Sequence, residues 1–405
     1  MVGLTDIPGL SAVSGAGSYE VTYDAMYKKY GGFDFPSVAI ELNGVEFSKN
    51  KNHMLVNDIR VELTSGFEAS IASFRIYNAY VIGEEGSDES KYLFENLKKQ
   101  TILGASANIS LGYGSEVKSV FKGFIASVDF CFVEDEPPYI EVTAMDVKGI
   151  MMASSYATQV AAKSYGEAVR ELLKRVYDKT STANITEKVT VTDTPDKKPA
   201  SAGDKASAET IEMVSESDYE FVVKAAKKFN YEFFVDRGNL LFRKARSEVR
   251  PLTSLSANGG IIFYRLGYSL TGMVERIEVR AIDPGTGKVL IAKDKYNEKL
   301  STASKAKALI KGSSKVYIDP TMFSQAQADA RLESLMAQMS YRLGSLECEC
   351  VGMPDLIPGR FMDISVGSPG DNLFYITNVV HELNRNGTYR TKLTGSVDKV
   401  RAGKV

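Results

Sequence analysis

A histidine and a glutamate stand side by side near the end of the chain, in the stretch NVVHELNRNGTYRTKL, residues 378–393. A zinc protease needs His-Glu-x-x-His on a helix, because two imidazoles one helical turn apart then reach the same metal ion. Arg385 stands where the second histidine would be, and the Asn-Arg-Asn-Gly run after Leu383 breaks a helix. We therefore predict no metal site and no cofactor, and expect His381 on a β-strand where it shares one face with Thr377, Val379 and Leu383.

Cysteines and carboxylates supply two further candidates for chemistry. Cys348 and Cys350 lie two apart, so both would point to one face of a strand, but a structural zinc site needs four ligands and usually CxxC-type spacing. Glu134, Asp135 and Glu136 are three consecutive carboxylates, and glycoside hydrolysis needs two that converge, which spacing alone does not exclude. We interpret the cysteines as packing residues and the acidic run as a solvated turn between strands.

Little else in the sequence suggests an enzyme. It has two histidines and no tryptophan, and it lacks the nucleophile-elbow, P-loop and dinucleotide-binding patterns. The net charge of −2, from 49 Lys plus Arg and 51 Asp plus Glu, gives no reason to expect a nucleic acid partner. No run of about 18 apolar residues occurs, and Asp6 and Pro8 interrupt the stretch that a signal peptide would need. We predict a non-enzymatic protein made in the cytoplasm, with no membrane span.

The chain is long enough for two to four domains, and its first β region is predicted at residues 36–155. Asn43-Gly44 separates two short alternating runs, which indicates a hairpin with a two-residue turn. Further alternating runs follow, punctuated by glycines and prolines. Many short strands of this kind predict a small β-barrel or sandwich.

Residues 156–250 combine helix and strand patterns. Apolar residues recur at helical spacing in 163–178, whereas the polar stretch at about 191–209 lacks large apolar residues and predicts a mobile loop. Ser217 and Glu220 have the spacing of a capping box, so a second helix is expected to begin there, and a hairpin pattern follows it. This segment is predicted to be an α/β domain.

Strand patterns return in residues 251–405 and enclose one inserted helix at 324–343. The helix is predicted from apolar residues that share one face, namely Ala328, Leu332, Leu335 and Met339. Asn386-Gly387 lies between the last two alternating runs, and this dipeptide favours a type I′ hairpin turn.

The first 35 residues are rich in Gly, Ser and Tyr and are predicted to form an arm rather than a domain. The arm has four candidate contact residues, which are Tyr19, Tyr23, Tyr27 and Tyr30. Aromatic residues are typical of interface cores, so the arm could anchor on a neighbouring protein. It could equally cover its own barrel, and both interpretations stay open.

The order of these elements resembles that of the hub proteins in the tails of contractile phages and related injection machines. The resemblance is carried by SDYEF and GNLLFRK, then GMVERIEVRAIDPGTGK, PGRFMDISVG and finally YITNVVHELNRNGTYRTKL, and it covers about residues 36–397. This is the family of late control protein D, to which the hub portion of VgrG is also similar. The family's motif positions, which are structural, fall here on Ser217, Asp218, Phe221, Pro358, Gly359, Val379, His381, Gly387, Tyr389 and Thr391.

The resemblance implies an α+β, mainly β fold in which two small tudor- or SH3-like β-barrels, 36–155 and 251–405, flank the α/β domain 156–250. It implies a homotrimer that forms a pseudo-sixfold ring and joins a sixfold tail tube to a threefold spike. The expected partners are the tail tube or a tube-initiator protein, a separate central spike protein, since the sequence ends soon after the last strand pattern, and other baseplate proteins. The protein would be made in the bacterial cytoplasm and assembled into the baseplate of a phage tail or phage-tail-like particle. The alternative is a cell-wall hydrolase or carbohydrate-binding module on the same tail.

Overall fold

The computed structural model describes most of the chain. The described residues are 19–46, 55–77, 95, 102–153, 155–177, 185–196, 210–282, 286–295, 304–320, 322, 324–365 and 373–398. Residues 1–18 of the predicted arm and 197–209 of the predicted mobile loop lie outside them. The domain boundaries at 35, 155 and 250 stay predictions.

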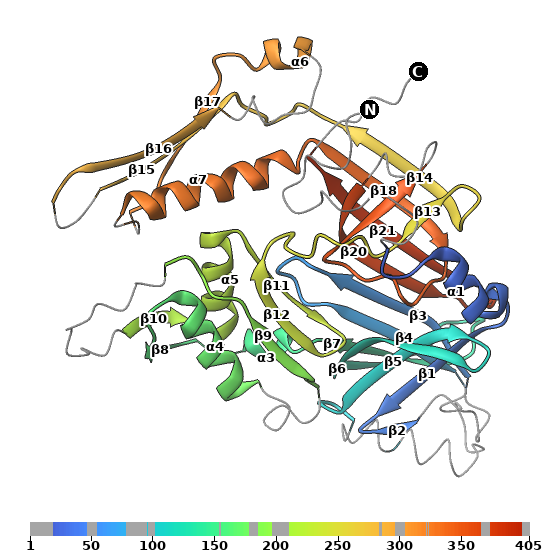
Figure 1. Cartoon of the computed structure of the whole chain (residues 1–405). Helices are drawn as coiled ribbons and strands as arrows, with labels where there is room; N and C mark the ends of the chain where they lie inside the picture. The colour runs from blue at the N-terminus through green and yellow to red at the C-terminus, as the bar shows by residue number, and fades with distance from the viewer. Residues whose placement is uncertain are drawn as a thin grey trace.

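One mostly antiparallel sheet of 13 strands runs through both β regions of the sequence (Figure 1). Its first half consists of β1 (Pro36–Leu42), β2 (Val45–Glu46), β3 (Leu55–Thr64), β4 (Ile71–Tyr77), β5 (Ser106–Tyr113), β6 (Glu116–Cys131) and β7 (Tyr139–Met145). Its second half consists of β13 (Ser254–Ser256), β14 (Ile261–Tyr268), β18 (Gly344–Val351), β19 (Arg360–Ser365), β20 (Leu373–Leu383) and β21 (Tyr389–Val397). The strand order is β14-β18-β21-β20-β3-β4-β7-β6-β5-β1-β2, with β19 beside β20 and β13 beside β19.

The two halves of the sheet meet where β3 pairs with β20. The pairing is antiparallel and runs from Asn378 opposite Thr64 to Leu383 opposite Ile59. A single cluster of buried apolar residues contains side chains from both halves. The prediction of a mainly β protein is confirmed. The two separate small barrels are not seen, since no closed barrel forms among the described strands and β3 and β20 join the two β regions into one open sheet.

The hairpin turns show where local sequence determines the backbone. Asn43 and Gly44 both have positive φ, 50° and 77°, as a two-residue type I′ turn between β1 and β2 requires. In the last hairpin only Gly387 has positive φ, at 76°, and its N–H donates to the Asn384 carbonyl at 2.9 Å. The predicted type I′ turn at Asn386-Gly387 is therefore wrong: the chain instead makes a type I turn that ends in a left-handed glycine, the usual longer hairpin loop.

Helices and two small sheets lie beside the first half of the large sheet (Figure 1). They comprise α3 (Lys148–Met151), β8 (Tyr156–Ala161), α4 (Tyr165–Val176), β9 (Lys188–Val191), β10 (Thr210–Glu216), α5 (Asp218–Phe229), β11 (Tyr231–Asp236) and β12 (Asn239–Lys244). We call these elements the α/β unit. Its apolar side chains form a second buried cluster, separate from that of the large sheet. Helix α5 begins with the predicted capping box of Ser217 and Glu220.

A third layer extends away from the large sheet and carries the inserted helix (Figure 1). It consists of β15 (Arg276–Ile282), β16 (Val289–Lys295), α6 (Ser304–Leu309), β17 (Ser314–Ile318) and α7 (Gln325–Ser340), with the strand order β16-β15-β17. The predicted apolar face of α7 packs on this sheet in a third buried cluster. The opposite face of the β16-β15-β17 sheet is exposed.

The N-terminal part of the described chain forms helix α1 (Tyr23–Lys29) and a single 3-10 turn, η2 (Gly31–Phe33). Thr22 caps α1 by accepting a hydrogen bond from the Ala25 N–H. Among the described residues, no helix has the length and apolar character needed to cross a membrane.

Candidate functional site

The loop between β18 and β19, residues 352–359, is where four parts of the chain meet, and we call it the junction loop. It receives side chains from the arm, from the first half of the large sheet, from the last hairpin and from the α/β unit. These side chains are Tyr30, Tyr113, Lys118, His381, Thr391, Phe234 and Arg243. The site therefore fixes the relative positions of elements rather than presenting reactive groups.

Asp355 of the junction loop binds both the arm and the first half of the sheet. The Tyr30 hydroxyl donates to its Oδ2 at 2.6 Å, and Lys118 Nζ donates to its Oδ1 at 2.6 Å. Burial raises the pKa of the Asp355 carboxyl, but the bonds from Lys118 and Tyr30 outweigh burial and hold that pKa below its usual value. Nearby, the Tyr113 hydroxyl donates to the Gly352 carbonyl at 2.8 Å.

The four arm tyrosines have different surroundings in the structure. Tyr30 is 1% exposed, and Tyr19 donates to Asp363 Oδ2 at 2.9 Å. Tyr23 packs on the large core, whereas Tyr27 is 49% exposed. The structure thus places three of the four against the chain itself, and contact of the arm with a partner stays a prediction.

His381 lies on β20, directly opposite Val61 of β3, and its ring is completely buried. Its Nε2 lies 3.2 Å from the Leu356 carbonyl, which can only accept, so Nε2 carries the proton. Nδ1 is then an acceptor, 3.0 Å from the Tyr389 hydroxyl and 3.1 Å from the Thr391 hydroxyl. The structure therefore brings together three of the family-motif positions, and burial lowers the pKa of His381 to about 4.

Pro358 and Gly359 form the turn by which the junction loop reaches the α/β unit. Gly359 has a φ of 77°, and a Cβ there would lie 2.6 Å from the Phe234 ring. Its N–H donates to the Ile376 carbonyl at 2.8 Å, while its carbonyl accepts from Arg243 at 2.6 Å. Only glycine fits this position, because both the backbone conformation and the approach of Phe234 exclude a side chain.

The remaining motif positions stabilise the elements on which they lie. The Ser217 hydroxyl accepts from the Glu220 N–H at 3.1 Å, and Tyr177 donates to Asp218 at 2.5 Å. Phe221 is fully buried in the cluster of the α/β unit, and Val379 in that of the large sheet.

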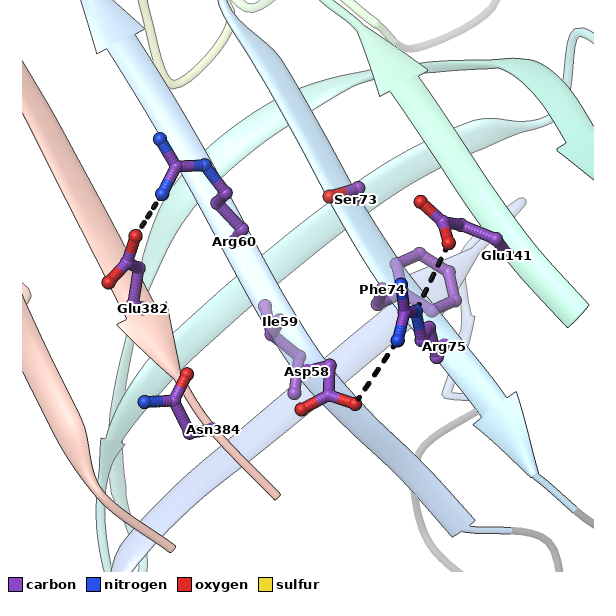
Figure 2. Close-up of a pocket in the computed structure, with 9 residues that line it drawn as sticks. All are labelled: Asp58, Ile59, Arg60, Ser73, Phe74, Arg75, Glu141, Glu382 and Asn384. Carbon is purple, nitrogen blue, oxygen red and sulfur yellow. Dashed lines mark hydrogen bonds and ion pairs between the residues drawn. The ribbon is translucent and has the colours of Figure 1, made fainter. Parts of the chain in front are cut away.

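A polar cavity of about 330 Å³ lies on the surface where β3, β4, β7 and β20 run side by side (Figure 2). Arg60 pairs with Glu382 across the β3–β20 junction, and Arg75 lies between Asp58 and Glu141. Each carboxylate here faces a guanidinium, so the arrangement is one of ion pairs across neighbouring strands rather than a pair of free catalytic carboxyls.

The other candidates for chemistry are not brought together with further reactive groups. Glu134, Asp135 and Glu136 are exposed in the turn between β6 and β7. Cys348 and Cys350 are buried in the large core, and burial raises the pKa of the Cys348 thiol to about 12. Within the described part of the chain, no three His, Cys, Asp or Glu side chains are grouped as metal ligands would be.

Two exposed surfaces with apolar side chains were not predicted from the sequence. The first is β14, whose only neighbour among the described strands is β18, and it exposes Ile262, Phe263, Tyr264 and Tyr268. The second is the outward face of the β15–β17 sheet, which exposes Ile282, Val289, Ile291, Val316 and Ile318. Alternation in these strands was visible in the sequence, but which face would be covered was not.

The chain has the fold of phage tail proteins and of a related injection-machine component. It matches a tail protein from Neisseria meningitidis MC58 with a TM-score of 0.60 and 12% identity, over 90% of this chain and 97% of that one. It matches the 43 kDa tail protein of prophage MuSo2 from Shewanella oneidensis with a TM-score of 0.60 and 12% identity, over 89% and 98%. A third match is E. coli c3393, with a TM-score of 0.50 and 10% identity, over 90% and 77%.

The E. coli protein is described as a component of the type VI secretion system with structural similarity to the T4 tail proteins gp27 and gp5. No protein-family model and no curated protein sequence matches the chain. The resemblance inferred from the order of sequence motifs is thus confirmed at the level of the fold, which the chain shares with these tail proteins at 10–12% sequence identity.

Proposed function

We propose that this protein is the baseplate hub of a contractile tail or injection particle. In this proposal three copies form a ring with pseudo-sixfold symmetry, because each copy contributes the two halves of its large sheet as two β units. The ring joins a sixfold tail tube to a threefold central spike, and the protein acts through its surfaces rather than as an enzyme.

The observation that carries the proposal is the joining of two β units within one chain. The β3–β20 pairing fixes the second half of the sheet against the first, and the junction loop fixes both against the α/β unit. A ring component must hold such units in a constant relative position, and the likeness over about nine-tenths of the chain to tail proteins supports this role.

The exposed apolar surfaces supply sites for partners. Strand β14, which pairs only with β18 among the described strands and carries aromatic side chains, is a template for another strand. The outward face of β15–β17 exposes apolar side chains interspersed with Arg276, Arg280 and Lys293 on a projecting layer. We assign these surfaces to contacts between copies and with the tail tube, the spike and other baseplate proteins, in a particle assembled after synthesis in the bacterial cytoplasm.

Mass and shape of the purified protein test the proposal. We expect light scattering to give three times the mass of one chain, alone or after addition of its tube or spike protein, and electron microscopy to show rings. A protein that stays monomeric with every such partner contradicts the hub assignment.

A further inference from the structure

Residues 19–30, the described part of the arm up to Tyr30, contact a defined site on the rest of the chain, and from here on we call these residues the arm. The Glu20 and Val21 N–H groups donate to the Pro251 and Leu252 carbonyls at 3.1 and 3.0 Å, and Arg360 forms an ion pair with Glu20. Tyr30 enters the junction loop. These contacts join residues far apart in sequence, so the local sequence does not require that an arm and its site belong to the same copy.

The segment that connects the arm to β1, residues 31–35, is a strained hinge. Gly31 and Gly32 have φ values of 56° and 76°, and Phe33 and Phe35 have values of 65° and 56°. Bulky L residues rarely adopt this region. The Phe33 ring packs on Tyr113, with ring centroids 5.3 Å apart, but Phe35 is 84% exposed and gains no packing in return.

We propose that the arm is exchanged between copies: in the homo-oligomer, residues 19–30 of one copy occupy the arm site of the next copy. A short strained hinge beside a well-bound element favours such exchange, since opening releases the strain and the contacts of the arm with the sheet and the junction loop are remade in the neighbouring copy. The contacts given up are those of Tyr23, Tyr27 and Tyr30 with Phe33 of the hinge. This inference rests on the proposed function, because it needs an oligomer. Fully extended, the five hinge residues span about 17 Å, which limits how far apart neighbouring sites can lie.

The exchange is tested by cross-linking two differently tagged chains. Glu20→Cys is introduced into one chain and Arg360→Cys into the other, both with Cys131→Ser, because Cys131 is the only cysteine that is not buried. The chains are co-expressed, the oligomer is isolated, and a short bismaleimide is added. We expect a cross-link between residues 20 and 360 of different chains, identified by mass spectrometry.

A chain that carries both Glu20→Cys and Arg360→Cys tests whether the arm stays on its own copy. If it cross-links only within itself in the isolated oligomer, while the mixed oligomer gives no cross-link, the arm stays on its own copy and the exchange is overturned although the hub assignment stands. If no oligomer forms at all, the exchange and the hub assignment fail together, and light scattering distinguishes this case.

Two hinge variants provide an independent measurement that leaves the arm contacts intact. Phe35→Gly removes the conformational penalty, whereas Phe35→Ala loses the same exposed ring but keeps the penalty. Relief of strain in the hinge favours the state in which the arm stays on its own copy. We therefore expect about tenfold fewer cross-links between copies for Phe35→Gly than for Phe35→Ala. Equal cross-link yields for the two variants would contradict a hinge driven by strain.

Discussion

The two halves of the large sheet are held together in two different ways. At β3 and β20 the link is a ladder of main-chain hydrogen bonds, with ion pairs on its surface. At the junction loop the link depends on side chains, chiefly Tyr30, Tyr113 and Lys118 around Asp355 and Gly352. The first link tolerates changes of side chain, whereas the second is lost when a few side chains are lost.

The β3–β20 ladder is therefore the more rigid link, and the side-chain contacts at the junction loop are the link that can change. A backbone ladder fixes the register of the two halves, because a slip by one residue would turn every buried side chain to the other face. The side-chain link can open without breaking the sheet. It is therefore the place where the arm can leave and where solution conditions can act.

Truncation of Tyr30 should have the largest effect of the predicted changes. Tyr30→Ala removes a ring that is 1% exposed together with its bond to Asp355, so we expect a loss of about 4 kcal/mol in stability. The measurement is the midpoint of thermal unfolding. Tyr27→Ala is the control on the same helix: its ring is half exposed and contacts only the rings of Tyr23 and Phe33, so we expect a smaller loss of about 1 kcal/mol. Equal losses of stability for Tyr30→Ala and Tyr27→Ala would show that the buried side of the arm contributes no more to stability than its exposed side.

Acid should weaken the same region through His381. Its pKa is about 4 in the folded chain and about 6.5 when unfolded, so between these values only the unfolded state gains the proton. Stability is unaffected by this group above pH 6.5 and falls as the pH drops towards 4, by roughly 3 kcal/mol in total.

His381→Gln isolates this contribution from the buried carboxyls, whose titration is common to both proteins. We expect unfolding curves of the variant to depend less on pH between 6.5 and 4, while the mass of the oligomer at neutral pH is unchanged. Parallel pH profiles for the two proteins would show that His381 does not titrate in this range. Loss of the oligomer at neutral pH would instead reveal a larger role for the ring in assembly.

The sequence predicted features whose causes are local. The capping box of Ser217 and Glu220 and the turn at Asn43-Gly44 are short-range matters of hydrogen bonding and backbone conformation, and both are found where expected. The mainly β character follows from alternation, which each strand shows by itself. These features need no knowledge of what lies elsewhere in the chain.

The site depends on contacts that no local pattern specifies. Pairing of β3 with β20 joins segments some 320 residues apart, as in Arg60 opposite Glu382, and alternation does not name a partner strand. Pro358 and Gly359 were recognised as motif positions, but Asp355 was not, because a carboxylate joins elements in this way only when Tyr30 and Lys118 approach it from distant parts of the chain. For the same reason the sequence predicted two barrels where the described strands form one sheet.

Ion pairs at the β3–β20 junction should contribute little compared with its backbone ladder. Arg60 and Glu382 are directly opposite each other, and the Arg60 side chain is 45% exposed. A double-mutant cycle with Arg60→Ala and Glu382→Ala should give a coupling free energy of about 0.5 kcal/mol, reduced by salt. A coupling above about 2 kcal/mol would mean that this junction also depends on side chains.

The acidic turn between β6 and β7 gives the smallest expected effect and addresses the hydrolase alternative. Glu134, Asp135 and Glu136 are exposed and lie outside both links, so replacing all three by Gln, Asn and Gln should change the unfolding temperature little and leave assembly intact. The same variant is incubated with purified cell wall beside the unchanged protein, and released sugars are measured. We expect no release from either, because catalysis by carboxylates requires two that converge on one bond, and exposed neighbours on a turn do not converge. Release of sugars by the unchanged protein but not by the variant would mean that this chain cleaves glycan, in contradiction of the structural role proposed for it.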